Sequence, residues 1–258
     1  MTESGGENYP DHEFIFNTVV TRFQSKKIIY LPVTSSTNDI AVREAQAGAL
    51  EGTIVIAGTQ TAGKGRLGRV WTSPEGVLAF SIILRPSLDR VSSLIMVSSL
   101  AVLHTIKQIT GIQAEIKWPN DVLIRGKKVS GTLIENGWRG NIPEYAVVGI
   151  GLNVNFNPDN YPEITGTATS LSRETGKFIP VREVTKQLII ELDQYYFQES
   201  VFEEWKANLV TLGKTIRVTS GKTVYSGIAQ SVDEHGSLIL RQPDGTIVTI
   251  NVGDVTLR

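Results

Sequence analysis

Residues 58–71 read GTQTAGKGRLGRVW, a stretch in which glycines alternate with basic side chains. Gly58, Gly63 and Lys64 match the start of the phosphate-binding pattern GxxxxGK[ST], but Gly65 stands where that pattern needs a hydroxyl group for magnesium. The residues that follow also lack the helical periodicity that would direct backbone amides and a helix dipole at a phosphate. The stretch is therefore a basic, glycine-rich loop and not a P-loop.

Such a loop can still bind an anion. Glycines let the backbone approach a ligand closely. Lys64, Arg66 and Arg69 can neutralise a polyphosphate or the charge that develops on a phosphoryl group in transfer. Trp71 offers a flat face for a base or for the closed loop itself. The loop alone leaves one alternative open, a mobile surface turn whose cations are simply solvated.

A second segment, KWPND at residues 117–121, combines a cation, an aromatic ring, a proline, an amide and a carboxylate. Asn120 and Asp121 offer oxygen ligands of the kind that magnesium prefers, with phosphates and water completing its coordination. Asp121 is equally suited to capping a turn. Shortly afterwards, either Lys128 or Lys127 could direct its ammonium group into a site, and periodicity alone does not separate the two.

Two further segments are suited to binding a ligand. GIGLNVN, residues 149–155, is a predicted strand in which two glycines lie near Asn153, and glycines inside strands often mark the close approach of a ligand or backbone. SSTN, residues 35–38, stands at a predicted helix start, where its hydroxyl groups are most simply helix caps.

Other kinds of chemistry find no support in the sequence. The chain has no cysteine, which excludes disulfides, thiolate metal sites and a cysteine nucleophile. The three histidines, at positions 12, 104 and 235, do not have metal-ligand spacing, and there is neither a GxSxG elbow nor a GxGxxG loop that opens a helix. The formal net charge of −1 argues against a general nucleic-acid binder.

The elements that must position these segments follow from hydrophobic periodicity. The 258 residues, 41% of them hydrophobic, suit a globular protein with one large domain or a medium and a small one. Strands are predicted at 27–33, 52–60, 76–86 and 144–156, with short strands and a turn at 125–127 between residues 113 and 138. Helices are predicted at 14–23, 34–48, 91–111 and, as one long amphipathic helix, 181–209. Residues 155–161 are predicted to form a mobile, turn-rich loop.

A domain boundary is expected near Gly213. The segments after it are short strands separated by turns, with a tight turn at 243–245, a pattern that fits a small β-barrel. The body before it mixes helices with strands that are close enough in sequence to pair antiparallel, so we predict an α+β fold. The expected organisation is a leader at 1–26, a main domain at 27–210 and a small domain at 213–258.

The cellular location can also be predicted. The first 13 residues are polar and acidic, without the basic region and apolar core of a secretory signal. No uninterrupted apolar stretch is long enough to span a bilayer. We therefore expect a cytoplasmic protein that does not bind membranes.

Taken in order, these segments resemble the biotin protein ligases, also called biotin–[acetyl-CoA-carboxylase] ligases. The resemblance runs from about residue 27 to the C-terminus, and it rests on SSTN at 35–38, QTAGKGRLGRVW at 60–71, KWPND at 117–121, KKVSGTLIE at 127–135 and GIGLN at 149–153. It implies a mixed catalytic sheet with packed helices, of the class II synthetase-like biotin/lipoate ligase fold, followed by a small SH3-like β-barrel.

The resemblance also implies an activity. The carboxylate of biotin attacks the α-phosphate of ATP, with Mg²⁺ as cofactor, to give biotinyl-5′-AMP and pyrophosphate. A lysine of a biotin carboxyl carrier protein, from acetyl-CoA carboxylase or another biotin-dependent carboxylase, then attacks the mixed anhydride and releases AMP. No protein nucleophile is needed, so catalysis would come from positioning and charge stabilisation.

Site residues carry over from the resemblance one by one. Catalysis is assigned to Lys128, which would bridge the biotin carboxylate and the α-phosphate, and to Arg66. The residues implied to bind biotin are Ser36, Thr37, Asn38, Gln60, Gly63, Lys64, Gly65, Arg66, Lys128, Gly131, Gly149 and Gly151. Those implied to bind ATP or the adenylate are Arg66, Arg69, Trp71, Asn120, Lys128 and Asn153. Asn120, and more weakly Asp121, would hold magnesium through the phosphates.

The sequence departs from the family pattern at one position. Many members have arginine where Lys64 stands, and lysine keeps the charge but loses the planar guanidinium that makes two parallel hydrogen bonds. About 26 residues precede the first predicted strand, too few for the DNA-binding domain of bifunctional members, so we expect the short form without DNA binding. A lipoate–protein ligase and a nonenzymatic biotin-binding module are the alternatives. The chain could be a monomer or a homodimer.

Overall fold

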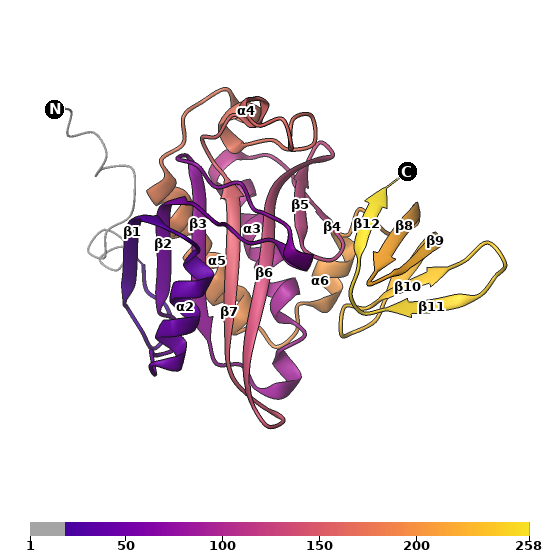
Figure 1. The fold of residues 1–258 in the computed structure, drawn as a ribbon, viewed down its shortest axis with the longest axis horizontal. Helices are drawn as coiled ribbons and strands as arrows, with labels where there is room; N and C mark the ends of the chain where they lie inside the picture. The colour runs from indigo at the N-terminus through magenta and orange to yellow at the C-terminus, as the bar shows by residue number, and fades with distance from the viewer. Residues whose placement is uncertain (1–18, 258) are drawn as a thin grey trace.

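The computed structural model describes residues 19–257, which form two β-sheets and their helices (Figure 1). The larger, seven-stranded sheet lies among the helices, and the five-stranded sheet stands beside it at the C-terminal end. Part of the helix predicted at 14–23 lies outside the described residues. Its remaining residues, 19–23, are not helical, although Val19 and Phe23 are both buried in the core. No helix among the described residues is long and apolar enough to cross a bilayer.

The seven-stranded sheet has the order β1-β2-β3-β7-β6-β5-β4. Its strands are β1 (Ile28–Thr34), β2 (Ile54–Gln60), β3 (Val77–Leu84), β4 (Glu115–Lys117), β5 (Asp121–Ile124), β6 (Lys127–Arg139) and β7 (Ile142–Asn153). β1 and β2 pair in parallel, and every other neighbouring pair is antiparallel. This mixed sheet confirms the predicted α+β class.

Helices cover both faces of this sheet (Figure 1). The short α2 (Thr37–Gln46) packs on one face, where Ala41 and Ala45 meet Val55 and Val147 in a small apolar cluster. α3 (Leu94–Thr110) and α5 (Val181–Tyr196) pack on the other face over the main hydrophobic core. α3 is buried over most of its circumference, as its continuous apolar sequence predicts.

The single helix predicted at 181–209 is wrong, because the structure breaks it into α5 and α6 (Phe202–Ala207). α5 ends at Tyr196, where Arg90 donates hydrogen bonds to the carbonyl oxygens of Tyr196 at 2.5 Å and Gln198 at 3.0 Å. These contacts satisfy carbonyls that a continuing helix would have bonded internally. Because α6 also packs on α3, the amphipathic pattern continues across the break. Hydrophobic periodicity therefore did not predict the break.

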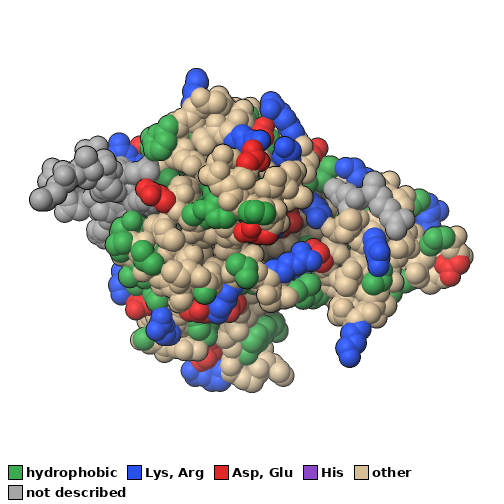
Figure 2. Space-filling view, turned by 45° about the horizontal axis from the view of Figure 1, so that its top comes forward, with side chains coloured by type: hydrophobic (Ala, Val, Ile, Leu, Met, Phe, Trp, Pro, Cys, Tyr) green, Lys and Arg blue, Asp and Glu red, His purple; other side chains and the backbone are tan. Residues whose placement is uncertain are grey.

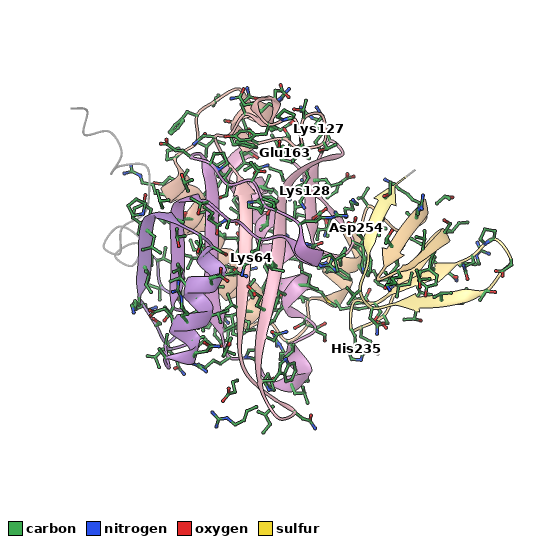
Figure 3. All side chains as sticks on the ribbon, viewed as in Figure 1. Lys64, Lys127, Lys128, Glu163, His235 and Asp254 are labelled. Atoms are coloured by element: carbon green, nitrogen blue, oxygen red, sulfur yellow. The ribbon has the colours of Figure 1, made fainter. Side chains whose placement is uncertain are left out.

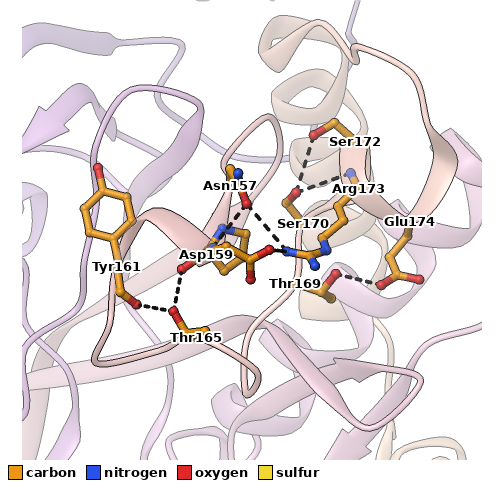
Figure 4. A network of polar contacts seen from close by, with 10 residues as sticks. Asn157, Asp159, Tyr161, Thr165, Thr169, Ser170, Ser172, Arg173 and Glu174 are labelled. Carbon is orange, nitrogen blue, oxygen red and sulfur yellow. Dashed lines mark hydrogen bonds and ion pairs between the residues drawn. The ribbon is translucent and has the colours of Figure 1, made fainter.

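The segment between β7 and α5 is built from turns, one 3₁₀ helix and one short α-helix (Figure 4). The predicted turn-rich stretch contains a 3₁₀ helix at Pro158–Asn160, in which the side chain of Asn157 accepts a hydrogen bond from the backbone N–H of Asp159. Arg173 donates to the carboxylate of Asp159 at 2.7 Å. Arg173 belongs to α4 (Leu171–Thr175), a helix that the sequence did not predict. The segment is thus folded against α4 by side-chain contacts.

The C-terminal sheet has the order β11-β10-β9-β8-β12 and is antiparallel throughout. Its strands are β8 (Thr215–Ser220), β9 (Thr223–Val232), β10 (Leu238–Arg241), β11 (Ile247–Ile250) and β12 (Asp254–Leu257). The predicted turn at 243–245 joins β10 to β11, and Gly245 there has a φ of 88°, which glycine adopts without strain. β12 was not predicted, and it places an acidic residue at the edge that faces the larger sheet.

Candidate active site

One pocket opens on the face of the large sheet beside the N-terminus of α2. It is floored by β3, β6 and β7 and crossed by the glycine-rich loop. Thirteen of the residues predicted to form the site line this pocket: Ser36, Thr37, Asn38, Gln60, Lys64, Gly65, Arg66, Trp71, Asn120, Lys128, Gly131, Gly149 and Gly151. The tertiary structure thus brings together segments that are more than 100 residues apart in the chain.

The start of α2 forms a polar cluster at one end of the pocket. Ser36 is the N-cap residue, yet its side chain makes no capping hydrogen bond. The side-chain oxygen of Gln60 instead accepts from the backbone N–H of Thr37 at 2.8 Å and from its hydroxyl at 3.1 Å. Gln60 therefore takes the place of a side-chain cap, and Ser36 lines the pocket. The helix-cap interpretation of this segment is therefore wrong for Ser36.

Two residues that sequence reasoning missed complete this cluster. The hydroxyl of Ser81 donates to Asn38 Oδ1 at 2.7 Å and lies 2.8 Å from Thr37 Oγ1. The Asn38 amide nitrogen donates to Glu135 at 2.7 Å. Ser81 is fully buried, and it is the one polar residue in the strand VLAFSIIL. A single hydroxyl group in an otherwise apolar strand could have identified Ser81 in the sequence, because buried polar groups are nearly always hydrogen-bonded to a partner.

The pocket floor needs glycine at two positions. A Cβ atom added to Gly149 would lie 2.0 Å from the Asn38 side-chain oxygen, and one added to Gly151 would lie 2.2 Å from the Trp71 ring. At Gly131 the nearest atoms, from Lys128, would be 3.1 Å away, which is a milder conflict. The two strand glycines therefore make room for the Asn38 amide and the Trp71 indole to lie directly on β7.

The glycine-rich loop is folded back on itself. The backbone N–H of Trp71 donates to the Gly63 carbonyl at 2.9 Å, and that of Gly65 donates to the Arg69 carbonyl at 2.7 Å. A Cβ atom on Gly63 would lie 2.3 Å from the Trp71 carbonyl oxygen, so Gly63 supports the loop from beneath and does not line the pocket. Within this hairpin Lys64 reaches across to form an ion pair with Asp39 on α2.

Each cation of the site contacts an oxygen of the protein itself. Arg66 donates to the Asn120 side-chain oxygen at 3.0 Å, and Lys128 Nζ lies 2.6 Å from an Asp121 carboxylate oxygen. Arg69 pairs with Asp254, the first residue of β12. Figure 2 shows acidic and basic side chains next to each other along the hollow between the main body and the C-terminal sheet. Lys64, Arg69 and Lys128 are thus paired with carboxylates, whereas Arg66 contacts a neutral amide.

Two of these cations have shifted pKa values. Burial lowers the pKa of Arg66, against the opposing influence of the Asp121 and Asp254 carboxylates. The pKa of Lys64 is raised, chiefly by its hydrogen bond to Asp39. Arginine's ordinary pKa is so high that Arg66 stays charged at neutral pH, and so does Lys64. Both therefore carry full positive charge where the loop meets the pocket.

The KWPND segment is anchored from the C-terminal part of the chain. The Trp118 ring is fully buried, its indole N–H donates to the Gly236 carbonyl at 2.8 Å, and its backbone N–H donates to the Thr211 hydroxyl at 2.9 Å. Asn120 is fixed in turn, because its amide nitrogen donates to the Thr132 carbonyl at 2.9 Å. The amide oxygen of Asn120 is thereby directed at the site.

The remaining predicted residues border smaller adjoining cavities. Arg69 and Asp121 line one, together with Arg66, Asn120 and Lys128. Asn153 lines a second with Trp71 and Lys128, and its amide donates to the Thr169 carbonyl at 2.9 Å. Lys128 Nζ lies 5.3 Å from the centre of the Trp71 ring, whose buried indole N–H has no partner among residues 19–257. Lys128 lines all three cavities and Lys127 none of them, which separates the two lysines that periodicity left equivalent (Figure 3).

The chain is similar in sequence to known proteins over most of its length. The sequence pattern described as "Biotin/lipoate A/B protein ligase family" matches residues 30–153, and that described as "Biotin protein ligase C terminal domain" matches residues 211–258. A bifunctional ligase/repressor BirA of Bacillus subtilis is 35% identical over 247 residues, which cover 92% of this chain and 76% of the relative. A biotin–[acetyl-CoA-carboxylase] ligase of Paracoccus denitrificans is 35% identical over 226 residues, with coverage of 82% and 93%.

A solved structure of a biotin protein ligase has a similar fold. The biotin protein ligase from Aquifex aeolicus in complex with biotin and ATP superposes with a TM-score of 0.76 at 31% sequence identity. The superposition covers 91% of this chain and 99% of that structure, so both sheets have counterparts there. The predicted fold class, a mixed catalytic sheet followed by a small C-terminal β-domain, is confirmed.

Proposed function

Because the chain belongs to the biotin protein ligase family, we infer that it is an ATP-dependent biotin–[acetyl-CoA-carboxylase] ligase. In its first half-reaction a biotin carboxylate oxygen attacks the α-phosphorus of ATP, and the bond to pyrophosphate breaks. In the second, the amine of a lysine on a biotin carboxyl carrier protein attacks the acyl carbon of biotinyl-5′-AMP. AMP leaves, the amine loses a proton, and an amide bond to biotin remains.

The convergence of five separate segments on one pocket is the observation that carries this proposal. The hydroxyls and amides of Ser36, Thr37 and Gln60 form a compact polar end that suits the ureido head of biotin, with Asn38 behind them. Glycines floor the middle of the pocket, where an apolar ring system and chain can lie against the backbone. The cations stand at the opposite end, where the biotin carboxylate would meet a phosphate.

We assign the central catalytic role to Lys128. Its ammonium borders the main pocket and both adjoining cavities, so one cation can contact the biotin carboxylate and the α-phosphate together. Its present partner, Asp121, would be exchanged for these ligand oxygens. Arg66, held by Asn120, would stabilise the negative charge that develops on the oxygens of the α-phosphate. Preorganised cations of this kind lower the barrier by stabilising charge that grows in the transition state.

The nucleotide is assigned to the adjoining cavities. Trp71 and Asn153 border the cavity that continues from the pocket, where the flat indole face suits a base. Arg69 borders the cavity nearest the C-terminal sheet, which suits the outer phosphates. Loop residues Gly65 and Lys64 would close over biotin, as the family resemblance implies.

Magnesium is assigned to this site only together with the nucleotide. Asn120 and Asp121 supply an amide and a carboxylate oxygen, the donor types that magnesium prefers. Among the described residues no group of three or more His, Cys, Asp and Glu side chains could hold a metal ion without a ligand. The two residues fit a magnesium ion whose remaining ligands are phosphate oxygens and water. Bound there, the ion would neutralise charge on the phosphates.

We propose that the reaction takes place in the cytoplasm, since it consumes ATP, and that the acceptor belongs to acetyl-CoA carboxylase or another biotin-dependent carboxylase. DNA and membranes have no part in the proposed reaction, and either a monomer or a homodimer could carry it out. We propose residues 27–210 as the catalytic domain and 213–258 as the C-terminal domain, with 1–26 as a leader. In support, the large sheet uses strands between residues 28 and 153, and the small sheet uses strands between 215 and 257.

ATP–pyrophosphate exchange tests the proposed function directly. Purified protein is incubated with ATP, Mg²⁺ and labelled pyrophosphate in the presence of biotin, lipoate or neither acid. Exchange that depends on biotin is the expected result, followed by transfer of biotin to a carrier domain. Exchange with lipoate alone would assign the protein to lipoate ligation. Biotin binding without any exchange would leave a binding protein that has lost the chemistry.

A further inference from the structure

The C-terminal sheet contributes one acidic side chain to the cavity proposed for the phosphates. Asp254 is the first residue of β12, the edge strand that pairs only with β8, at Thr219. Its carboxylate accepts a hydrogen bond from the terminal guanidinium nitrogen of Arg69, which lies 185 residues earlier in the chain. Figure 3 shows Asp254 at the edge of the C-terminal sheet that faces the main body. The contact therefore joins β12 directly to the glycine-rich loop.

The carboxylate of Asp254 lies among the cations of the site. Asp254 borders the same cavity as Arg66, Arg69, Asn120 and Lys128. Its negative charge also acts on the half-buried Arg66, because it is one of the two carboxylates that oppose the lowering of the Arg66 pKa. A polyphosphate entering this cavity would therefore meet three cations and, among them, a like charge supplied by another part of the fold.

Carboxylate and phosphate oxygens compete for the same guanidinium donors. Arginine binds both through charge-assisted N–H···O hydrogen bonds of similar geometry. Both side chains of the pair keep contact with solvent, 64% exposed for Arg69 and 32% for Asp254, so the pair is open to exchange with a ligand from solution. Such exposed ion pairs are individually weak. A multivalent anion can therefore displace this carboxylate.

We propose that Asp254 sets the affinity of the enzyme for ATP by competing with an outer phosphate of the nucleotide for Arg69. When ATP binds, the phosphate replaces the carboxylate on the guanidinium, and β12 is released from the glycine-rich loop. The proposal rests on the proposed use of ATP. Asp254, which lies outside the large sheet, would thus weaken nucleotide binding in the resting enzyme. Nucleotide binding would also be coupled to the C-terminal sheet.

The test is the KM for ATP in biotin-dependent pyrophosphate exchange, measured for wild type and Asp254→Asn. The variant removes the charge and keeps the size, so its KM for ATP should fall by about two- to fivefold while the KM for biotin stays the same. Asp244→Asn is a matched control, because Asp244 lies in the β10–β11 turn of the same sheet and bonds the backbone of Thr246. It should leave both constants unchanged.

Two further comparisons isolate the competition. In an Arg69→Gln background, Asp254→Asn should have no effect on the KM for ATP, since the contested group is gone. Raising the salt concentration to about 0.5 M should shrink the difference between Asp254→Asn and wild type, because screening weakens exposed charges. An unchanged or raised KM for ATP in Asp254→Asn overturns the proposal, as does an equal effect with and without Arg69.

A measurement on the wild-type protein covers the case in which Asp254→Asn fails to fold. Amide hydrogen exchange in residues 254–257 should become faster when a nonhydrolysable ATP analogue binds, because β12 loses its contact with the loop. Slower exchange there would show that the nucleotide tightens this contact, and the competition would be refuted. Absence of any biotin-dependent exchange by the wild-type enzyme would instead contradict the proposed function, which keeps the two failures distinguishable.

Discussion

The indole N–H of Trp118 donates a 2.8 Å hydrogen bond to the backbone carbonyl of Gly236, 118 residues further along the chain. Trp118 belongs to the KWPND segment, whose Asn120 and Asp121 contact Arg66 and Lys128. Gly236 lies in the turn between β9 and β10 of the C-terminal sheet. A segment that lines the candidate site on one sheet is thus anchored to a backbone atom beside the other sheet.

This relationship predicts the effect of Trp118→Phe. The variant loses the hydrogen bond and part of the buried ring, at a cost of about 1–3 kcal/mol in the free energy of unfolding. Because Asn120 follows closely, the KM for ATP should rise more than the KM for biotin. Thermal unfolding and exchange kinetics test both parts. Trp138→Phe, at a ring that is 46% exposed at the end of β6, is the control and should change neither quantity.

Lys128→Ala should abolish adenylate formation without unfolding the protein. Lys128 borders the pocket and both adjoining cavities, so its removal leaves no cation between the biotin carboxylate and the α-phosphate. We expect pyrophosphate exchange to fall by at least about a hundredfold. Lys127→Ala is the matched control, being the same change at the adjacent residue. Near-normal turnover by a folded Lys128→Ala protein would refute the assignment.

Gly149→Ala should weaken biotin binding. The new methyl group would lie 2.0 Å from Asn38 Oδ1, so the amide must leave Ser81 and Glu135 and disturb the polar end of the pocket. Titration calorimetry with biotin should show an affinity at least about tenfold lower, equivalent to 1.4 kcal/mol.

A second glycine separates this effect from a general loss of stability. Gly48 follows α2 with a φ of 90°, and a Cβ atom there would meet nothing within 4 Å. Gly48→Ala should therefore lower the melting temperature through backbone strain while biotin affinity stays at the wild-type value. Equal affinity losses in the two variants would show that Gly149 acts through stability alone.

Asp39→Asn should loosen the glycine-rich loop. Asp39 on α2 is the ion-pair partner of Lys64, and the pair ties the loop to the helix at the mouth of the pocket. We expect trypsin to cleave the loop faster in the variant, at Lys64, Arg66 or Arg69, and biotin to protect it less. Glu44→Gln, which breaks the pair between the same helix and Lys27, should leave cleavage of this loop unchanged.

The same ion pair predicts a pH dependence. The pKa of Lys64 is raised in the folded protein from its ordinary value of 10.5, mainly by the hydrogen bond to Asp39. Stabilisation from this pair is therefore complete below pH 10.5 and is lost as the pH rises through the raised value. Loop protection should stay constant from about pH 7 to 9, and in the wild type it should fall only in strongly alkaline solution. A steep loss near pH 8 would contradict this origin.

Many of the helices and strands could be predicted from the sequence, because the local hydrophobic pattern agrees with the way these elements pack in the folded protein. The β-branched run that became β2 and the buried helix α3 have few other ways to hide their apolar surface. The family-specific segments were likewise visible, since glycines, cations and amides occur at fixed spacings. The break between α5 and α6 was not visible, because the decisive contact comes from Arg90, more than 100 residues earlier in the chain.

The sequence by itself determined which chemical groups are present and the elements that carry them: a basic glycine loop, an amide and carboxylate after KWP, and glycines within β7. Only the tertiary structure decided how these groups are paired. It made Gln60 and not Ser36 the cap of α2, and it brought Ser81, Glu135 and Asp254 to the site. The physical reason is that hydrogen bonds and ion pairs depend on distances of about 3 Å between atoms, and periodicity along a chain does not specify such distances between remote segments.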